Sequence, residues 1–551
     1  MVRDRSDDPH TRLPFDRPYW IALTLITCLA AVLRLWGLDS RSLWGDEINM
    51  IDFARGARDM SLSGGNAIGY LPVISAISVI SNTDWALRLP AALAGTASIP
   101  LTALLGRMLL GSWTGIGAAA LLAVAPMHVV MSQQVHAYAL FTSVLIVAAM
   151  FWAAGVHTAS RRAGVGFGFF AAVALHLHQF AVFVVAPIVL AWLIGVWTRR
   201  RWVREYAGYA SWKWMLVAAA VFLVVAGPYA AIWTAPQIAG MLGVGDEGVN
   251  EHFELSPRFE LGWSLVPTIT GDLISWRGWW PLVTVAVWGL AAVGAVWILF
   301  RRRIPALALV LWVGLPPLPI VVFSHAARLQ VGTHRLIMIL PPLLLLASYG
   351  IFETLAAAGR HWRWGPRIRS VSLACGGLAI ATVMVAMLNG PMSQWRRFEY
   401  PDLRAAAAVV RGEATENDLV LVFRPHHIQR YGCGEAPMFH VTDVRNDFRR
   451  LAADRSRVFY VRPGNVDTRP HLRAVTDWVE SLGGFRFATG GGLVVTVAPL
   501  QPEARSEWRF TKSRILALAA RERPHDEALA VAAGEAAIDA TDGDTRVGGT
   551  K

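Results

Sequence analysis

Long apolar stretches recur between residues 19 and 390 and decide what kind of fold the chain can adopt. A helix needs about 20 apolar residues to cross a bilayer, and about eleven stretches approach or reach that length. Inside a bilayer the backbone must satisfy its own hydrogen bonds, so each stretch is expected to be helical. The sequence therefore predicts a polytopic α-helical membrane protein. The expected spans are 19–38, 87–106, 115–131, 138–156, 164–178, 180–198, 213–234, 279–300, 304–323, 336–356 and 370–390.

The composition supports a membrane protein and argues against a nucleic-acid partner. Hydrophobic residues make up 54% of the chain and charged residues only 16%, against roughly 25% charged residues in soluble proteins. The net charge is +12, but the arginines lie mainly in short runs between apolar stretches, which is typical of cytoplasmic loops. We therefore expect a multi-pass protein of the cell membrane that binds no nucleic acid.

The arginine runs also predict how the chain is oriented in the membrane. If the N-terminal segment 1–18 is cytoplasmic, the expected spans place every arginine-rich loop on the cytoplasmic side. The apolar segment 67–82 would reverse this arrangement if it crossed, so we expect it to be a helix in the outer interface. Two loops, 39–66 and 235–278, are then extracytoplasmic, and they carry 11 of the 14 acidic residues between positions 19 and 390. The outer face is therefore where polar chemistry is expected.

The pattern changes after the membrane domain, which is expected to cover 19–390. Within 391–501, expected helices at 400–413, 448–455 and 470–482 alternate with expected strands at 418–423, 457–461 and 491–500. This alternation indicates a small α/β domain, which the expected orientation places outside the cytoplasm. Residues 502–551 are polar and are expected to be disordered, because they carry too few bulky apolar side chains to offset the entropy of folding.

An adjacent pair of acids, Asp46 and Glu47, follows the first span within the segment LRLWGLDSRSLWGDEINM, residues 33–50. The flanking apolar and aromatic residues place this pair at the boundary between water and lipid. A carboxylate in such a position can act as a general base or can hold a cation. A solvated loop pair without chemical function is the alternative, and the dipeptide alone favours that alternative.

Several segments resemble, in the same order, signatures of the GT-C membrane glycosyltransferases in the superfamily of protein O-mannosyltransferases and aminoarabinose transferases, which is glycosyltransferase family 39-like. The acidic pair lies in the first of them, RLWGLDSRSLWGDE (34–47). The others are WALRLPAALAGTASIPLTALLGRMLLG (85–111), LLAVAPMHVVMSQQVHAYAL (121–140), HLHQFAV (176–182) and THRLIMILPPLLLLA (333–347). The resemblance extends over about residues 20–500, and it implies a GT-C-like fold with an appended C-terminal domain.

The chain departs from the family pattern at several positions. NAIGYL (66–71) stands where many relatives have His-Pro-Pro-Leu-Tyr-Tyr, and only Tyr70 matches. In the element SQQVHAY, Gln134 replaces an acid and His136 replaces an arginine. Leu336 replaces the tyrosine that follows the arginine of the late helix. These departures indicate a divergent member.

The resemblance also implies an activity. The chain would take a sugar from a polyprenyl-phosphate carrier, expected to be undecaprenyl phosphate, and pass it to a glycan, lipid or protein acceptor outside the cytoplasm. Asp46 would be the general base of a single inverting displacement, and Glu47 would support the geometry or a divalent cation. No other cofactor is implied and no metal ligands are assigned. The chain has no Gly-rich nucleotide fingerprint, which disfavours a nucleotide-sugar donor.

Basic and aromatic residues near the outer ends of the spans are candidates for binding the donor. Arginine can bind a phosphate through two parallel hydrogen bonds, so Arg335 with His334 is expected to hold the donor phosphate. Arg88 is a further candidate, with snorkelling of its side chain to the interface as the alternative. The remaining substrate-binding candidates are His136, Tyr138 and Tyr70.

A transporter or flippase for lipid-linked sugars is the alternative function with a similar polytopic pattern. Many such proteins show internal repeats and ionisable groups near the bilayer midplane. This sequence shows no internal repeat, and its acids are concentrated in the expected outer loops. We therefore expect an enzyme.

Overall fold

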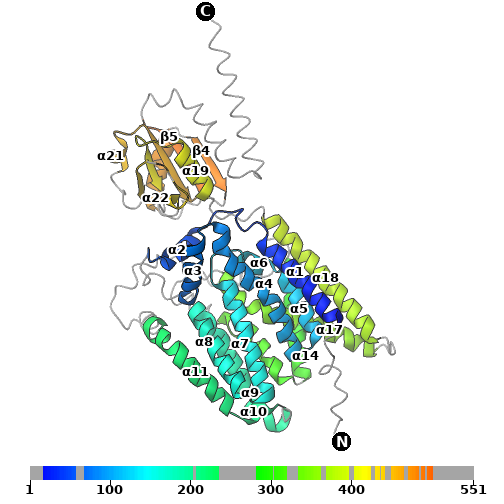
Figure 1. Cartoon of the computed structure of the whole chain (residues 1–551). Coiled ribbons are helices and arrows are strands. Elements are labelled where there is room, and N and C mark those ends of the chain that lie inside the picture. The colour runs from blue at the N-terminus through cyan, green and yellow to red at the C-terminus, as the bar shows by residue number, and fades with distance from the viewer. Residues whose placement is uncertain are drawn as a thin grey trace, which may run out of the picture. The chain divides into compact units, whose positions relative to one another are not determined.

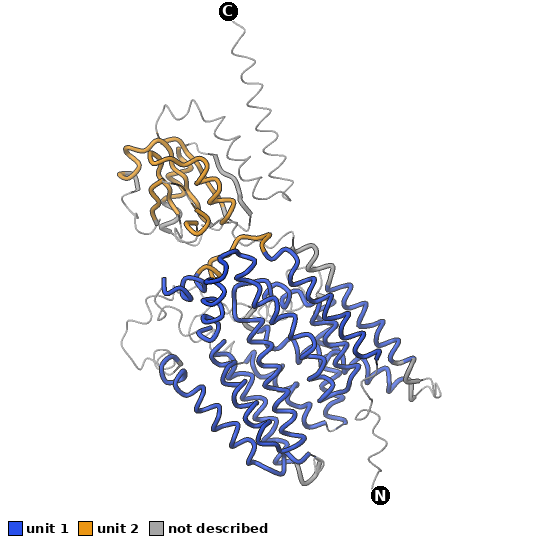
Figure 2. Tube along the Cα trace, in the orientation of Figure 1, with its two compact units in different colours: residues 1–38, 49–395 blue, residues 39–48, 396–551 orange. Residues whose placement is uncertain are grey.

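The structure is a computed structural model that forms two compact units (Figures 1 and 2). The helical unit comprises Met1–Leu38 and Asn49–Trp395, and the α/β unit comprises Asp39–Ile48 and Arg396–Lys551. Most of the expected cytoplasmic segment 1–18, the outer loop 235–278 and the tail 502–551 lie outside the described residues. The described residues are 17–57, 67–202, 206–234, 281–301, 303–318, 333–361, 368–395, 403–422, 428–432, 434, 436–440, 448–463, 470–482, 485–490 and 493–500.

The helical unit consists of apolar helices, as the sequence predicts (Figure 1). Among the described residues, seven helical segments are long and apolar enough to cross a membrane. They contain α1 (Arg17–Leu35), α4 (Asp84–Leu109), α7 (Tyr138–Thr158), α9 (Val182–Trp202), α11 (Lys213–Tyr229), α14 (Pro281–Phe300) and α17 (Leu340–His361). The other α-helices that the structure describes entirely within this unit are α3 (Leu71–Ile80), α5 (Ser112–Val124), α6 (Pro126–Met131), α8 (Arg161–Leu177), α10 (Ala207–Ala210), α15 (Leu307–Gly314) and α18 (Ile368–Trp395).

Within the described residues, short helices of other types extend several of these elements. Four are 3₁₀ helices, η3 (Ile68–Tyr70), η4 (Gln179–Ala181), η7 (Ile304–Ala306) and η8 (Thr333–Ile339). One is a π-helix, η5 (Ala230–Thr234). Every expected span overlaps a helix of the structure. The segment 67–82 forms η3 and the 10-residue helix α3, which are shorter than the roughly 20 residues that a span requires; its place in the outer interface stays a prediction.

Glycines allow α14 and α17 to pack closely against each other. A Cβ atom at Gly294 would overlap the backbone carbonyl of Leu346, and one at Gly350 would overlap the carbonyl of Leu290. Lipid provides no hydrophobic force between helices, so close backbone contact through small residues is a main source of helix association in membranes. The reciprocal glycines therefore explain why these two helices form a pair.

The α/β unit contains a five-stranded mixed sheet with strand order β2-β1-β3-β5-β4. Strand β1 is parallel to β2 and β3, whereas β5 is antiparallel to β3 and β4. The expected strands are present as β1 (Leu419–Val422), β3 (Arg457–Pro463) and β5 (Leu493–Pro499), and the expected helices as α19 (Leu403–Glu413), α21 (Phe448–Ala452) and α22 (Pro470–Ser481). The sequence did not predict the two edge strands, β2 (Met438–His440) and β4 (Phe485–Gly490).

Both faces of the central strands are buried. One face forms a core with α21 and α22, made by Leu419, Leu421, Ala452, Val458, Tyr460, Val475, Val479 and Ala498. The alternate residues Val420, Phe459 and Val497 are also fully buried. A strand that is covered on both faces reads as a continuous apolar run rather than an alternating one, which is why β1 was recognisable from the sequence.

A buried ion pair joins the turn before β1 to the start of β3. Arg457 donates from Nε and Nη2 to the two carboxylate oxygens of Asp418, at 3.1 and 2.8 Å. The side chain of Asp418 is fully buried and also accepts from the backbone N–H and hydroxyl of Thr415. Every carboxylate oxygen thus has a partner, so the pair is well compensated for its loss of water.

Replacing Asp418 with alanine is expected to destabilise the α/β unit by about 3–5 kcal/mol, because Arg457 is left without its counter-charge. Thermal unfolding of the full chain and hydrogen exchange of β1 and β3 would measure the change. The control is Glu353→Ala, which breaks the pair between Glu353 and the half-exposed Arg301 at 3.4 Å and is expected to cost only about 0–1 kcal/mol. Unchanged protection of β1 in the Asp418 variant would contradict the prediction.

Candidate functional site

The acidic pair lies in the first turn of helix α2 (Gly45–Ala54), and its two carboxylates differ in environment. Glu47 is 1% exposed, whereas Asp46 is exposed. Glu47 Oε2 accepts a hydrogen bond from the backbone N–H of Trp44 at 3.1 Å. Trp44 precedes the first helical residue and Glu47 is the third, so this bond is the glutamate half of a capping box. Glu47 therefore stabilises the helix start, and Asp46 presents its carboxylate there.

Two further features fix the start of α2. Leu43 and Ile48 are 0% and 1% exposed, and they occupy the positions of a hydrophobic staple on either side of the first turn. The N-terminus of a helix favours negative charge, because its first N–H groups lack helical partners. Asp46 is thus held on a defined helix end.

A second group of candidates meets in the helical unit. The rings of His136 and Tyr138 are stacked, with centroids 4.1 Å apart and planes 6° from parallel. The ring of His178 lies 5.6 Å from that of Tyr138. His178 Nδ1 accepts from the backbone N–H of Phe180 at 3.2 Å, so in the neutral ring Nε2 carries the proton. His178, which is not among the substrate-binding candidates chosen from the sequence, extends the predicted pair.

Tyr70 is fully buried at the end of η3, which packs against α8. A Cβ atom at the neighbouring Gly69 would lie 3.1 Å from the backbone of His176, closer than most Cβ contacts, so glycine eases this approach. His176 is near the end of α8, and α8 leads into the turn that contains His178. Helix η3, with Tyr70, therefore packs against the helix that leads to the ring of His178.

Arg88 is a buried residue and not one that snorkels to the interface. Its side chain is 4% exposed, and Nη1 donates to the carbonyl oxygen of Leu38 at 2.7 Å. Gln133 acts on the same stretch of chain, because its Nε2 donates to the carbonyl oxygens of Leu33 and Trp36, each at 3.1 Å. Both side chains thus hold the end of the first span, directly before the segment that carries the acidic pair.

Arg34 is a polar residue of this region to which the sequence analysis gave no role. It is fully buried, and it donates to the carbonyl oxygens of Leu122 and Ala123 at 3.2 and 3.0 Å and contacts His128 Nδ1 at 2.8 Å. The two carbonyls belong to the last turn of α5, where a cation is favourable because helix C-termini carry unpaired carbonyls. An arginine within an apolar span is the signal that could have identified it.

The segment with Arg335 and His334 forms the seven-residue 3₁₀ helix η8. Runs of 3₁₀ helix longer than three or four residues are uncommon and often mark functional segments. Helix η8 packs against α6, α7 and α17, so its backbone lies beside the helix that begins with Tyr138. The side chains of His334 and Arg335 lie outside the described residues.

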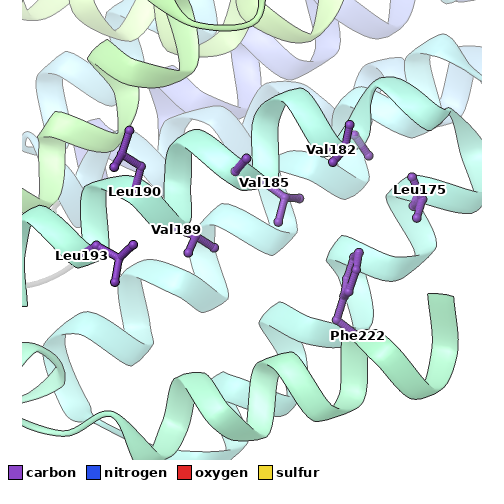
Figure 3. Close-up of a pocket in the computed structure, with 9 residues that line it drawn as sticks. Leu175, Val182, Val185, Val189, Leu190, Leu193 and Phe222 are labelled. Carbon is purple, nitrogen blue, oxygen red and sulfur yellow. The ribbon is translucent and has the colours of Figure 1, made fainter. Parts of the chain in front are cut away.

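An apolar pocket of about 300 Å³ lies among α8, α9 and α11 (Figure 3). Leu175, Val185 and Phe222 are among the side chains that line it, and none of the predicted site residues does. Val182 and Leu193 at its rim are about half exposed, as expected for a surface that faces lipid. The pocket therefore suits an apolar chain and is not a site of polar chemistry.

A complete cation site is not present in the part of the chain that the structure describes. No group of three or more His, Cys, Asp or Glu side chains meets there. Glu47 uses one carboxylate oxygen for the backbone of Trp44, whereas divalent cations such as calcium and magnesium require about six or more oxygen ligands. We derive no step through a metal ion.

Comparison with known proteins shows the fold of the chain and a family match over part of its length. Residues 71–233 match the family model described as dolichyl-phosphate-mannose-protein mannosyltransferase. No curated protein sequence matches the chain. Among solved structures, the chain is similar to ArnT from Cupriavidus metallidurans in the apo state, with 15% identity and a TM-score of 0.52 over 88% of this chain and 98% of ArnT.

Two further structures are similar at the level of fold. ArnT from Cupriavidus metallidurans bound to undecaprenyl phosphate has 16% identity and a TM-score of 0.52, again over 88% of this chain and 98% of that one. Oligosaccharyltransferase AglB from Archaeoglobus fulgidus, in complex with an inhibitory peptide and a dolichol-phosphate, has 12% identity and a TM-score of 0.50 over 87% and 74%. The expected resemblance is confirmed: residues 71–233 match the dolichyl-phosphate-mannose-protein mannosyltransferase family model, and the chain has an ArnT-like fold.

Proposed function

We propose that the chain transfers a sugar from a polyprenyl-phosphate donor to an acceptor outside the cytoplasm. The observation that carries this proposal is Asp46, an exposed carboxylate held on the first turn of α2 by the cap that Glu47 provides. The proposal is supported by the fold, because a protein of similar fold has been solved with undecaprenyl phosphate. The acceptor is a glycan, lipid or protein that offers a hydroxyl or amine.

The proposed reaction is a single displacement with inversion at the anomeric carbon. Asp46 accepts the proton of the acceptor hydroxyl, and the acceptor oxygen attacks the anomeric carbon from the face opposite the phosphate. The bond between that carbon and the phosphate oxygen breaks, and its electron pair leaves with the polyprenyl phosphate. Positioned general bases typically contribute about 10²–10⁴-fold to such steps.

The donor phosphate is assigned to Arg335 and His334 on η8. This assignment is supported by the position of η8 against α7, whose first residue is Tyr138. The stacked pair of His136 and Tyr138 is proposed to contact the sugar of the donor. Tyr70 and Arg88 are proposed to complete the donor side.

The membrane arrangement is part of the proposal. We propose about eleven crossings, a cytoplasmic N-terminus, and an extracytoplasmic α/β domain within 391–501. Helix α3 is then at the outer surface, and the turn between α7 and α8 is cytoplasmic. A lipid-linked donor would in this case be used at the outer face, where the acidic pair is located.

Cysteine labelling tests this orientation. Cys28, Cys375 and Cys433 are first replaced by alanine, and either Asn82→Cys or Ser160→Cys is then introduced at the turns before α4 and α8. Intact cells are treated with a thiol reagent that cannot cross the membrane. Asn82→Cys is expected to be labelled and Ser160→Cys to be labelled only after the cells are opened. The reverse pattern would overturn the orientation.

The function is tested with purified protein in liposomes that contain a polyprenyl-phosphate sugar. A transferase is expected to consume the donor and release polyprenyl phosphate when a cell-envelope extract supplies the acceptor. A transporter would move the donor between leaflets and leave the sugar–phosphate bond intact. Movement without bond cleavage would therefore reject the proposed function.

A further inference from the structure

The segment that leads into α2, together with the first turn of α2, belongs to the α/β unit, although it lies more than 300 residues earlier in the chain. We call residues 39–48 the acidic loop; it is coloured with the α/β unit in Figure 2. Three hydrogen bonds link it to α19 and to the turn that contains Tyr431. The loop residues involved are Asp39, Ser42 and Leu43, which precede α2, the helix with Asp46.

The first bond caps a helix from a distant part of the chain. Ser42 Oγ accepts from the backbone N–H of Leu403 at 3.1 Å. Leu403 is the first residue of α19, so its N–H has no partner inside the helix. Serine is a preferred residue for satisfying such groups, and here it comes from a residue 361 positions away. The acidic loop and the start of α19 therefore stabilise each other.

The second and third bonds involve Tyr431 and Arg404. Tyr431 Oη accepts from the backbone N–H of Leu43 at 2.5 Å, and Arg404 Nη1 donates to the carbonyl oxygen of Asp39 at 3.1 Å. The Arg404 guanidinium lies 5.6 Å from the centre of the Tyr431 ring, within the range of cation–π attraction. Arg411 Nη1 also donates to the Tyr431 carbonyl at 2.6 Å. Tyr431, which bonds to the acidic loop, is thus itself fixed by contacts with Arg404 and Arg411.

These contacts define where the first turn of α2 begins. Leu43 is fully buried and directly precedes Trp44, whose N–H is capped by Glu47. A shift of Leu43 would move the capped turn and with it Asp46. Catalysis is sensitive to such shifts, since a displacement of about 1 Å can cost about 100-fold in rate.

We propose that the α/β unit is a platform that positions the acidic loop for catalysis, and that Tyr431, Arg404 and Ser42 are positioning residues. This inference rests on the proposed function of Asp46. It gives the C-terminal domain a role in the reaction that does not require it to contact the donor or the acceptor. The platform acts by fixing backbone groups of the loop through side chains of α19 and of the Tyr431 turn.

The test compares matched variants of the full-length protein. Tyr431→Phe removes the acceptor for the Leu43 N–H, and Tyr460→Phe is its control, because that buried tyrosine of β3 bonds to Thr476 within the same unit. Arg404→Ala is paired with Arg450→Ala, an exposed arginine on α21. Ser42→Ala is paired with Ser42→Thr, which keeps the hydroxyl.

The expected result is a loss of turnover without a loss of donor binding. Tyr431→Phe should lower kcat by about 5- to 10-fold, as one hydrogen bond and a small displacement would, while the KM for the polyprenyl-phosphate sugar is unchanged. Tyr460→Phe and Arg450→Ala should leave kcat unchanged. Ser42→Thr should recover the kcat that Ser42→Ala loses. Together with Asp46→Asn, Tyr431→Phe should cause no further loss, because positioning acts through the carboxylate.

Each other outcome has a distinct meaning. Equal losses in Tyr431→Phe and Tyr460→Phe, or an additive loss together with Asp46→Asn, would overturn the platform in favour of general destabilisation. An inactive Asp46→Asn protein with unchanged Tyr431→Phe and Ser42→Ala would overturn the platform and leave the proposed function in place. Full activity of Asp46→Asn would overturn the proposed function itself. If Tyr431→Phe does not fold, Ser42→Ala and Ser42→Thr test the platform. A kcat that falls in Ser42→Ala and is recovered in Ser42→Thr supports it, and an unchanged kcat in Ser42→Ala overturns it.

Discussion

Replacing Asp46 with asparagine is expected to lower sugar transfer by about 10²–10⁴-fold, the range that general-base loss typically causes. Asparagine keeps the shape of the side chain but cannot accept the acceptor's proton. Folding should be preserved, because Asp46 is exposed and Glu47 still accepts the capping hydrogen bond from Trp44. The measurement is the release of polyprenyl phosphate by purified, monodisperse protein in liposomes.

Glu47→Gln is the matched control for this change. The glutamine amide oxygen can still accept from the Trp44 N–H, so the start of α2 is retained and the loss should be far smaller than for Asp46→Asn. Near-wild-type transfer by the Asp46 variant would reject Asp46 as the base. A larger loss from Glu47→Gln than from Asp46→Asn would assign the base to the buried carboxylate instead.

The different roles of these two acids could not be read from the sequence. Both stand in one dipeptide between aromatic and apolar residues, and both resemble the same family motif. Their difference is one of burial, 1% exposed for Glu47 and exposed for Asp46, and it follows from the direction in which the helix starts. The position of that start depends on Leu43, whose N–H donates to Tyr431, a residue 388 positions away.

The helices of the membrane domain were predictable because their signal is local. A run of apolar residues is sufficient to identify a span, whatever its neighbours are. The edge strands β2 and β4 were missed, because three-residue Met438–His440 has no pattern of its own and pairs only through β1. The contact of Ser42 with Leu403 could not be predicted at all, because no periodicity connects residues 361 positions apart.

Arg34 is the opposite case. The sequence shows a charged residue within an apolar span, but it does not show which groups that residue binds. A charged residue in an apolar span is expensive and is expected to find partners or a cavity. The structure gives it the last carbonyls of α5 and the ring of His128. Whether Arg34 binds protein groups or faces a cavity depends on where α5 ends. That end is set by the extended Ala125 before Pro126.

Arg335→Ala is expected to lower kcat/KM for the polyprenyl-phosphate donor by about 10–100-fold, which corresponds to one charge-assisted contact to phosphate. Arg335→Lys should recover only part of this loss, because lysine is a point charge without the planar fork of arginine. The measurement is donor-dependent kinetics of purified protein, with binding of polyprenyl phosphate alone as a second readout. The kcat/KM for the donor and the affinity for polyprenyl phosphate should fall together if Arg335 holds the phosphate.

The position of Arg335 makes this expectation specific. It lies in η8, which packs against α6 and α7, so loss of a phosphate contact there differs from a general loss of positive charge. The control is Arg301→Ala, an exposed arginine paired with Glu353 near the end of α14, which should leave donor kinetics unchanged. Equal effects of Arg335→Ala and Arg301→Ala would remove η8 from the donor site. Equal activity of Arg335→Lys and wild type would show that a positive charge alone is required, and that bidentate binding of the phosphate is not.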